Sequence, residues 1–342
     1  MSASLLVFNS PLRLGWKNNA AEALNLGLFA VFAWYSIVQF RRNNRVYAFV
    51  MVTALIYGVS LELMGMATVN LYTQGPFTVM LNFPVIPLFE GTTAMPLYVS
   101  IYYPVIFMTG FKVLEGLGIA TRWRAAVAGG LFLICQEAPF VIQGGLTDVR
   151  WFTWRHDPML QFFMGWPLVD MYWQITWGTV FFYLVLRARA NIDGAATAQR
   201  WSTGRALGLW APVVAAAVIV VGCILFAPII LAKVTIGRHW PVLAVLVAGY
   251  LVVTVTALRA AQPPSRRIQG VTLGVVVAYV GTFAAMVIAN AVHEEGITAY
   301  MVVQTLGLIG VTALATFPLW SRQDSEAGDS VGVKAQGAQH SS

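Results

Sequence analysis

The sequence predicts an all-α, polytopic integral membrane protein with about nine transmembrane helices. Of the 342 residues, 58% are hydrophobic and 10% are charged, and the mean hydropathy is +0.70. Soluble domains average about 25% charged residues. Uncharged apolar runs close to the ~20 residues that a bilayer requires recur along the chain. Only helices and closed barrels satisfy their backbone polar groups in lipid, and these runs are too long and continuous for barrel strands.

Nine runs have the length and composition of membrane-spanning helices. The predicted spans are Ala20–Phe40, Val46–Val69, Ala94–Val113, Ala125–Ile142, Gly165–Leu186, Ala206–Ala232, Pro241–Leu258, Ile268–Ala291 and Ile297–Leu319.

The distribution of basic residues predicts the orientation. Fifteen of the 21 Lys and Arg residues lie in the loops that follow the first, third, fifth and seventh spans or in the carboxyl tail, all on one side of the membrane. The other six lie on the opposite side. The positive-inside rule therefore predicts a multi-pass protein of the cell membrane with its amino terminus outside and its carboxyl terminus in the cytoplasm. The net charge of +7 is explained by this asymmetry, and no nucleic-acid partner is expected.

The chain divides by composition into three parts. Residues 1–186 are predicted to form a five-helix membrane core rich in acids and aromatics, residues 187–320 a four-helix apolar scaffold, and residues 321–342 a disordered cytoplasmic tail. No cleavable signal peptide is recognisable in the first residues. Cys135 and Cys223 both lie within predicted spans, so a disulfide framework is not indicated.

Two acidic residues interrupt apolar spans in the first half of the chain. Glu62, in the second span, is flanked by Leu and Met, and Glu137, in the fourth span, is followed by Pro139. A carboxylate in a membrane helix costs roughly 2.5–3.5 kcal/mol on insertion scales and indicates function by default. Burial also favours the neutral acid, which is a proton donor. The alternative for each is a structural acid, with Ser60 or Tyr57 as a local partner for Glu62.

The stretch from Gly144 to Leu186 holds most of the remaining chemistry. Five of the twelve Trp residues fall within it, namely Trp151, Trp154, Trp166, Trp173 and Trp177. On a helix, Asp170, Trp173 and Trp177 share one face, because they are spaced i, i+3 and i+7. The loop before the helix carries Asp148. Trp151 and Trp154 have an alternative role as anchors in the aromatic belt.

The segment between the second and third spans is predicted to be an extracytoplasmic loop folded back into the membrane. Residues 70–93 contain no Lys or Arg, and Pro84 and Pro87 oppose a continuous helix. Glu90, near its end, is interpreted as an interfacial acid. Tyr102, in the third span, is either a belt residue or part of a pocket lining.

The predicted topology places Glu62, Glu137 and Asp170 in the same half of the membrane. Together with the indoles they predict a hydrophobic cavity with carboxyl groups in an aromatic wall. Such a site suits protonation of an alkene, because a desolvated acid donates more readily and a cation is attracted to aromatic faces. Preorganised charge stabilises the developing carbocation.

The motifs of several other chemistries are absent from the sequence. It contains no acidic diphosphate-binding cluster, HExxH motif, histidine box, GxSxG motif, P-loop or Gly-rich dinucleotide loop. We therefore expect acid–base chemistry without a metal site or cofactor, or no chemistry at all.

Three segments carry two family resemblances. The segments are LELMGMATVNLYTQG, FEGTTAMPLYVSIYYPVI, and the Asp/Trp-rich DVRWFTWRHDP leading to GWPLVDMYW. They resemble the carotenoid hydratase family, membrane proteins that add water to acyclic carotenoids. The placement of acids within membrane spans is also similar to that of the membrane-bound terpene cyclases of meroterpenoid and drimentine-type pathways. Those enzymes protonate a terpenyl alkene or epoxide with intramembrane acids. The likeness covers roughly residues 46–186, and nine spans exceed the number usual in the fungal cyclases.

The leading hypothesis is an acid-initiated isoprenoid cyclase. Glu62 or Asp170 is the expected proton donor, the other acid or Glu137 orients it or accepts the final proton, and the five Trp residues shape the substrate. The expected partners are an isoprenoid or prenylated small molecule and membrane lipids, with a homo-oligomer as a further possibility. The alternatives are a hydratase, a proton-coupled transporter of small lipids or cations, and a structural subunit.

Overall fold

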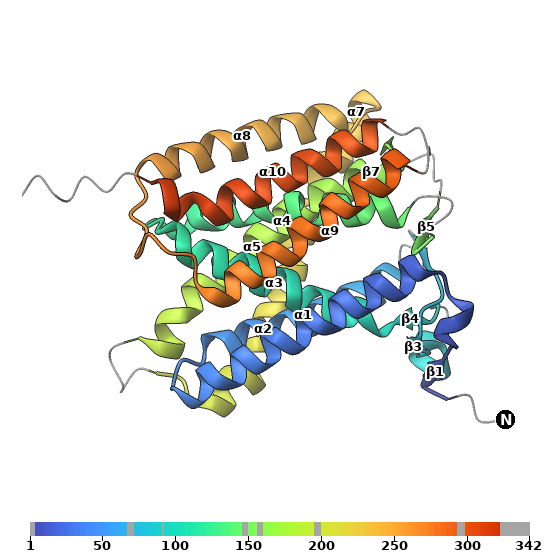
Figure 1. Cartoon of the computed structure of the whole chain (residues 1–342), viewed down its shortest axis with the longest axis horizontal. Coiled ribbons are helices and arrows are strands. Elements are labelled where there is room, and N and C mark those ends of the chain that lie inside the picture. The colour runs from blue at the N-terminus through green and yellow to red at the C-terminus, as the bar shows by residue number, and fades with distance from the viewer. Residues whose placement is uncertain are drawn as a thin grey trace, which may run out of the picture.

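The computed structural model describes residues 4–66, 72–90, 92–145, 150–155, 160–194, 200–292 and 298–321, and within these it is a helical bundle with small strand pairs at one end (Figure 1). The long helices are α1 (Trp16–Arg41), α2 (Val46–Met64), α3 (Leu97–Leu117), α4 (Arg122–Gly144), α5 (Leu168–Asp193), α6 (Ala211–Leu225), α7 (Ala227–Ile236), α8 (Trp240–Arg259), α9 (Gly270–Val292) and α10 (Thr298–Trp320). The prediction of an all-α membrane architecture is confirmed as far as helix content and helix length go.

Eight described helical segments are long and apolar enough to cross a membrane. One of them joins a π-helical turn (Arg205–Trp210), α6 and α7 into the continuous run Arg205–Ile236, with a break at Phe226 ahead of Pro228. The fifth predicted span, α5, is not among the eight, because Asp170, Gln174 and several aromatics lower its hydropathy. The count of nine therefore stays a prediction. At 26 residues, α5 is about 39 Å long by the helical rise.

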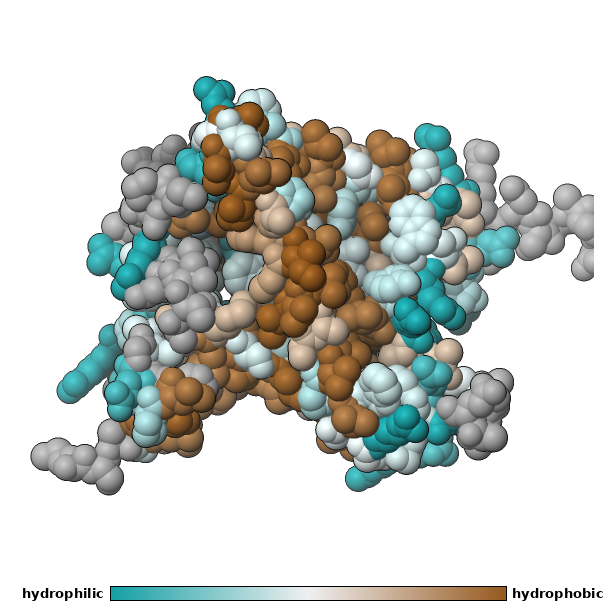
Figure 2. Space-filling model, turned by 180° about the vertical axis from the view of Figure 1, so that it is seen from behind, coloured by the Kyte–Doolittle hydropathy of each residue, from teal (hydrophilic) through white to brown (hydrophobic). Residues whose placement is uncertain are grey.

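Apolar side chains cover the outside of the bundle as well as its interior. Val245 of α8, Ile224 of α6 and Ile288 of α9 are 75%, 67% and 62% exposed, and Figure 2 shows a largely apolar surface across the middle of one face with hydrophilic residues toward both ends. Exposed apolar surface this extensive is unfavourable in water and indicates contact with lipid.

The strands form three small antiparallel sheets at the end of the bundle where α1 begins (Figure 1). Their bounds are β1 (Leu6–Phe8), β2 (Tyr72–Gln74), β3 (Val79–Leu81), β4 (Met95–Pro96), β5 (Phe152–Trp154), β6 (Phe162–Phe163) and β7 (Trp166–Pro167), and the order is β1-β3-β4, β2-β5 and β6-β7. Short 3₁₀ turns lie at Pro11–Arg13, Phe83–Val85 and Pro87–Phe89.

The segment predicted as a membrane loop thus contains strands that sequence analysis did not predict. Within 72–90 the absence of a long helix agrees with the prolines, but β2 pairs with β5 and β3 pairs with β1 and β4. Glu22 of α1 helps to hold this cap, since its carboxylate oxygens accept hydrogen bonds from the backbone N–H groups of Thr78 (3.1 Å) and Val79 (3.2 Å). Residues 67–71, into which the second span was predicted to extend, lie outside the described residues, as does the tail from 322.

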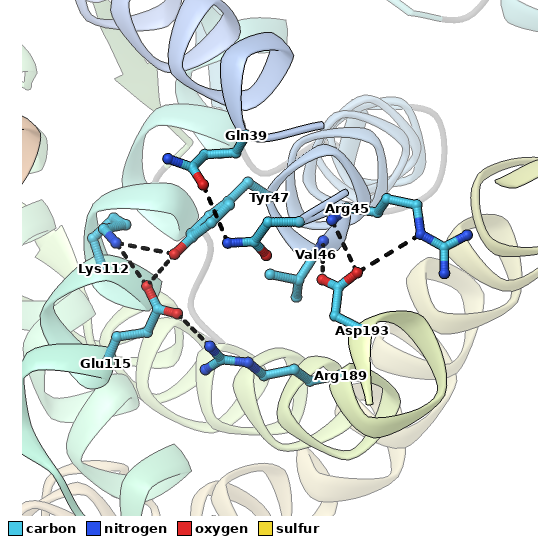
Figure 3. Close-up of polar contacts among 9 residues, drawn as sticks. Gln39, Arg45, Val46, Tyr47, Lys112, Glu115, Arg189 and Asp193 are labelled. Carbon is cyan, nitrogen blue, oxygen red and sulfur yellow. Dashed lines mark hydrogen bonds and ion pairs between the residues drawn. The ribbon is translucent and has the colours of Figure 1, made fainter. Parts of the chain in front are cut away.

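The opposite end of the bundle is tied together by a charged clamp, made of Arg45, Tyr47, Lys112, Glu115, Arg189 and Asp193 (Figure 3). Asp193, at the end of α5, accepts hydrogen bonds from the backbone N–H groups of Arg45 (3.0 Å) and Val46 (2.8 Å) and so caps α2. Glu115 accepts hydrogen bonds from Tyr47 and Lys112, both at 2.7 Å.

The helices of the second half of the chain pack directly against those of the first. Tyr279 and Phe283 of α9 and Phe317 of α10 belong to the same buried core as Phe107 of α3 and Phe140 of α4. The contact of α10 with α4 is close at Gly307, where an added Cβ would lie 2.6 Å from the carbonyl oxygen of Cys135. Small residues of this kind allow helix backbones to approach in membrane bundles.

Gly307→Ala is expected to destabilise the fold by about 1–3 kcal/mol, as overpacking of a close contact does. The helix backbone at Cys135 cannot move aside without shifting α4. The measurement is thermal unfolding of the detergent-solubilised protein. Gly249→Ala on α8 is the control, because its new Cβ would meet none of the described residues within 4 Å; equal effects of the two substitutions would contradict the close contact.

Glu115→Ala is expected to destabilise the fold by about 3–5 kcal/mol, because it leaves the Lys112 ammonium buried without its carboxylate. The Lys112 side chain is 0% exposed. Arg189→Ala removes the other cationic partner of Glu115, at 2.8 Å, but that side chain is 43% exposed, and a loss of less than ~1 kcal/mol is expected. Thermal unfolding distinguishes the two, and an equal loss in both would show that Lys112 does not depend on Glu115.

Candidate active site

A cavity of about 100 Å³ lies beneath the strand cap and receives side chains from α1, α2, α3, α4, α5, β2 and β5. We call it the acid cavity, because Glu62, Glu137 and Asp170 all line it. Its aromatic wall consists of Tyr72, Tyr98, Tyr102, Tyr103, Phe140, Trp151, Phe152, Trp154 and Trp173. The three acids, which come from three separate helices, therefore line one chamber.

Each acid is buried, and each reaches the cavity from a different helix. Glu62 and Glu137 are 5% and 1% exposed, and Asp170, in the first turn of α5, is 8% exposed. Glu137 lies within electrostatic range of the other two. None of the described residues that line the cavity is Lys, Arg or His. The negative charge that this site can hold is limited accordingly, since like charges in a low dielectric repel strongly.

Glu62 is held by two tyrosines. Tyr103 of α3 donates a hydrogen bond to Oε1 at 2.7 Å, and Tyr72 of β2 donates one to Oε2. Tyr72 reaches this position because β2 pairs with β5, which places Tyr72 opposite Trp154. Burial, together with the neighbouring Glu62, raises the pKa of Tyr72 well above its ordinary value, so that its phenol keeps the proton it donates.

Asp170 is held by an indole. Trp166 of β7 donates a hydrogen bond from Nε1 to Oδ2 at 2.6 Å. The two residues are four positions apart, with Trp166 in the strand that directly precedes α5. Trp166 is 1% exposed and does not belong to the lining of the cavity.

Glu137 differs from the other two acids. Its Oε1 is buried and has no hydrogen-bond partner in the described part of the chain. The helix α4 runs without interruption through Pro139, two residues further on. A buried oxygen without a donor favours the uncharged form of a carboxyl group over the carboxylate.

The predicted indoles divide into two groups. Trp151, Trp154 and Trp173 line the cavity, and so does Tyr102, whereas Trp177 packs behind it. Trp177 lies against Trp173 and Tyr57, at ring-centroid distances of 4.7 Å and 6.3 Å. Asp148 lies outside the described residues. Sequence analysis did not single out Tyr72 as a site residue, nor Gln74, Gln174 and Asn25, which also line the cavity.

The arrangement does not form an ion-binding cluster. In the ranges that the structure describes, no group of three or more His, Cys, Asp and Glu residues is placed to hold a metal ion.

Comparisons with known proteins do not assign the chain to a family. No family model matches the sequence, and no curated protein and no solved structure matches it.

Proposed function

We propose that this protein is a membrane-embedded cyclase that protonates an alkene or epoxide of an isoprenoid or prenylated substrate and stabilises the resulting carbocation. The observation that carries the proposal is the acid cavity itself, in which carboxyl groups from α2, α4 and α5 line one aromatic-walled chamber. The family likeness to membrane-bound terpene cyclases is consistent with this chemistry and is part of the proposal.

The membrane topology belongs to the same proposal. The described chain begins at the strand-capped end of the bundle and ends at the opposite end (Figure 1), which requires an odd number of crossings. Counting α5 as a span gives nine. The positive-inside rule then places the charged clamp on the cytoplasmic side and the strand cap and acid cavity toward the outside of the cell membrane.

The hydrogen bonds suggest a division of roles among the acids. Phenol and indole donors stabilise Glu62 and Asp170 as carboxylates, whereas Glu137 lacks such a donor on Oε1. Glu137 is therefore the proton donor that we favour over Glu62 and Asp170. Either of these two hydrogen-bonded acids, in its charged form, is suited to oppose a developing cation and to accept the final proton.

The reaction is balanced without a redox partner. The Glu137 carboxyl group transfers its proton to one alkene carbon, and the other becomes a carbocation. The π electrons of a second alkene form the ring bond, and the new cation loses a proton to Glu62 or Asp170. The faces of Trp151, Trp154 and Trp173 attract the intermediates by ~2 kcal/mol or more when water is excluded. The proton must return to Glu137 before the next turnover.

Membranes that contain the protein are expected to convert a linear prenylated aromatic compound into a cyclic product of the same mass. Glu137→Gln is expected to lower the rate by about 10²–10⁴-fold, the range of general acid catalysis. Product formation is followed by chromatography and mass spectrometry. Glu90→Gln is the control, because Glu90 is exposed and lies outside the lining of the cavity.

Two results would count against this assignment. Full activity in Glu137→Gln would exclude Glu137 as the donor, and full activity in Glu62→Gln and Asp170→Asn as well would exclude acid initiation in this cavity. Unchanged substrate across several prenylated lipids, together with proton-coupled uptake into proteoliposomes, would favour the transporter.

A hydratase is the second candidate. It would generate the same carbocation and quench it with water, for which a cavity of about 100 Å³ has room. Its product gains the mass of one water, so the same experiment separates the two reactions.

A further inference from the structure

A second cavity lies on the lipid side of the aromatic wall. It has a volume of about 330 Å³ and opens between α1 and α9, with α4 behind it. Its rims include Ala20 and Leu24 of α1 and Ala285 and Met286 of α9. We call it the lateral groove. Figure 1 shows α1 and α9 on the same side of the bundle.

The lateral groove and the acid cavity share a wall. Ala21, Phe140 and Trp151 line both spaces. All three are buried, at 5%, 7% and 4% exposure, whereas Ala20 and Ala285 at the rims are exposed. Exposure therefore decreases from the lipid-facing rim toward the acids, and only one layer of side chains separates the two spaces.

Phe140 is the centre of this wall. Its ring lies 6.0 Å from that of Tyr102 on the acid-cavity side, 6.3 Å from that of Trp151, and 5.7 Å from that of Phe283 on α9. Movement of one aromatic side chain would join the two spaces.

Most residues that line the lateral groove are apolar, and its polar lining residues are Lys17, Gln143 and Thr282. The Gln143 Oε1 accepts hydrogen bonds from Asn290 at 3.0 Å and from Gln304 at 2.9 Å. That amide oxygen is thus engaged by α9 and α10. Alanines at positions 20, 21, 285 and 289 leave the space open. Such a surface suits a hydrocarbon chain.

We infer that the lateral groove admits the substrate from the bilayer and holds its apolar tail while the reacting end lies in the acid cavity. This inference rests on the proposed function. The relative volumes support it, because the acid cavity is about 100 Å³ and the groove about 330 Å³. The groove therefore receives most of a long isoprenoid chain, and selects for substrates with such a tail.

The inference is tested with a farnesol analogue that carries a photoreactive diazirine at the end of its chain. In membranes containing the full-length protein, irradiation is expected to label α9 near Ala285 and Met286, and an excess of farnesol is expected to suppress the label. Ala285→Trp fills the groove and is expected to lower labelling about tenfold or more, since a steric loss of 1.4 kcal/mol corresponds to a factor of ten.

Two further variants control for misfolding. Ala20→Trp fills the same groove from α1 and is expected to have the same effect as Ala285→Trp. Ile288→Trp adds the same side chain to α9 at a position that is 62% exposed and outside the groove lining, and labelling is expected to be unchanged. Undiminished labelling in Ala285→Trp, or an equal loss in Ile288→Trp, would overturn the inference.

The photolabelling experiment tests the tail site, and the assay for a cyclised product tests the proposed function, so the two can fail independently. Saturable labelling in the groove without any cyclised product would support the tail site and count against the cyclase. Cyclisation without labelling, and with equal rates in Ala285→Trp and the parent protein, would overturn the tail site alone.

Discussion

The structure depends on keeping three carboxyl groups out of lipid. An apolar helix can carry an acid only where that acid faces the interior of the bundle, because exposure to hydrocarbon is unfavourable by several kcal/mol. Glu62, Glu137 and Asp170 satisfy this requirement by facing the same interior space. The requirement fixes the rotation of α2, α4 and α5 about their axes, and the packing of the remaining helices follows from it.

The two ends of the bundle handle buried charge in different ways. In the charged clamp every acid has a cation close to it, as Glu115 has Lys112 at 2.7 Å and Arg189 at 2.8 Å. In the acid cavity the donors to Glu62 and Asp170 are neutral phenols and an indole, and Oε1 of Glu137 has no donor in the described part of the chain. Paired charges hold helices together and do not readily exchange protons, whereas acids without a cationic partner in a dry site remain able to exchange them. The architecture thus separates structural polar contacts from reactive ones.

Periodicity and hydropathy were sufficient to predict most of the helices and the pooling of the acids in one half of the bundle. The predicted fourth span, Ala125–Ile142, lies within α4, and the fifth, Gly165–Leu186, ends before α5 does because Arg187 and Arg189 interrupt the apolar run. The strand cap could not be predicted, since β2 and β5 are three-residue strands about 80 positions apart whose pairing depends on the bundle beneath them. Tyr72 was missed for that reason. Helical spacing from Asp170 predicts that Trp177 joins the site, and sequence proximity suggests the same for Trp166, but neither indole lines the cavity.

The acid cavity also carries a stability cost. The indole nitrogens of Trp151 and Trp154 and the hydroxyl of Tyr102 are buried without hydrogen-bond partners in the described part of the chain, as is Oε1 of Glu137. A buried polar group left unpaired costs about 1–3 kcal/mol, so a wall of Leu and Phe would give a more stable bundle. Proteins accept such losses where a site requires them.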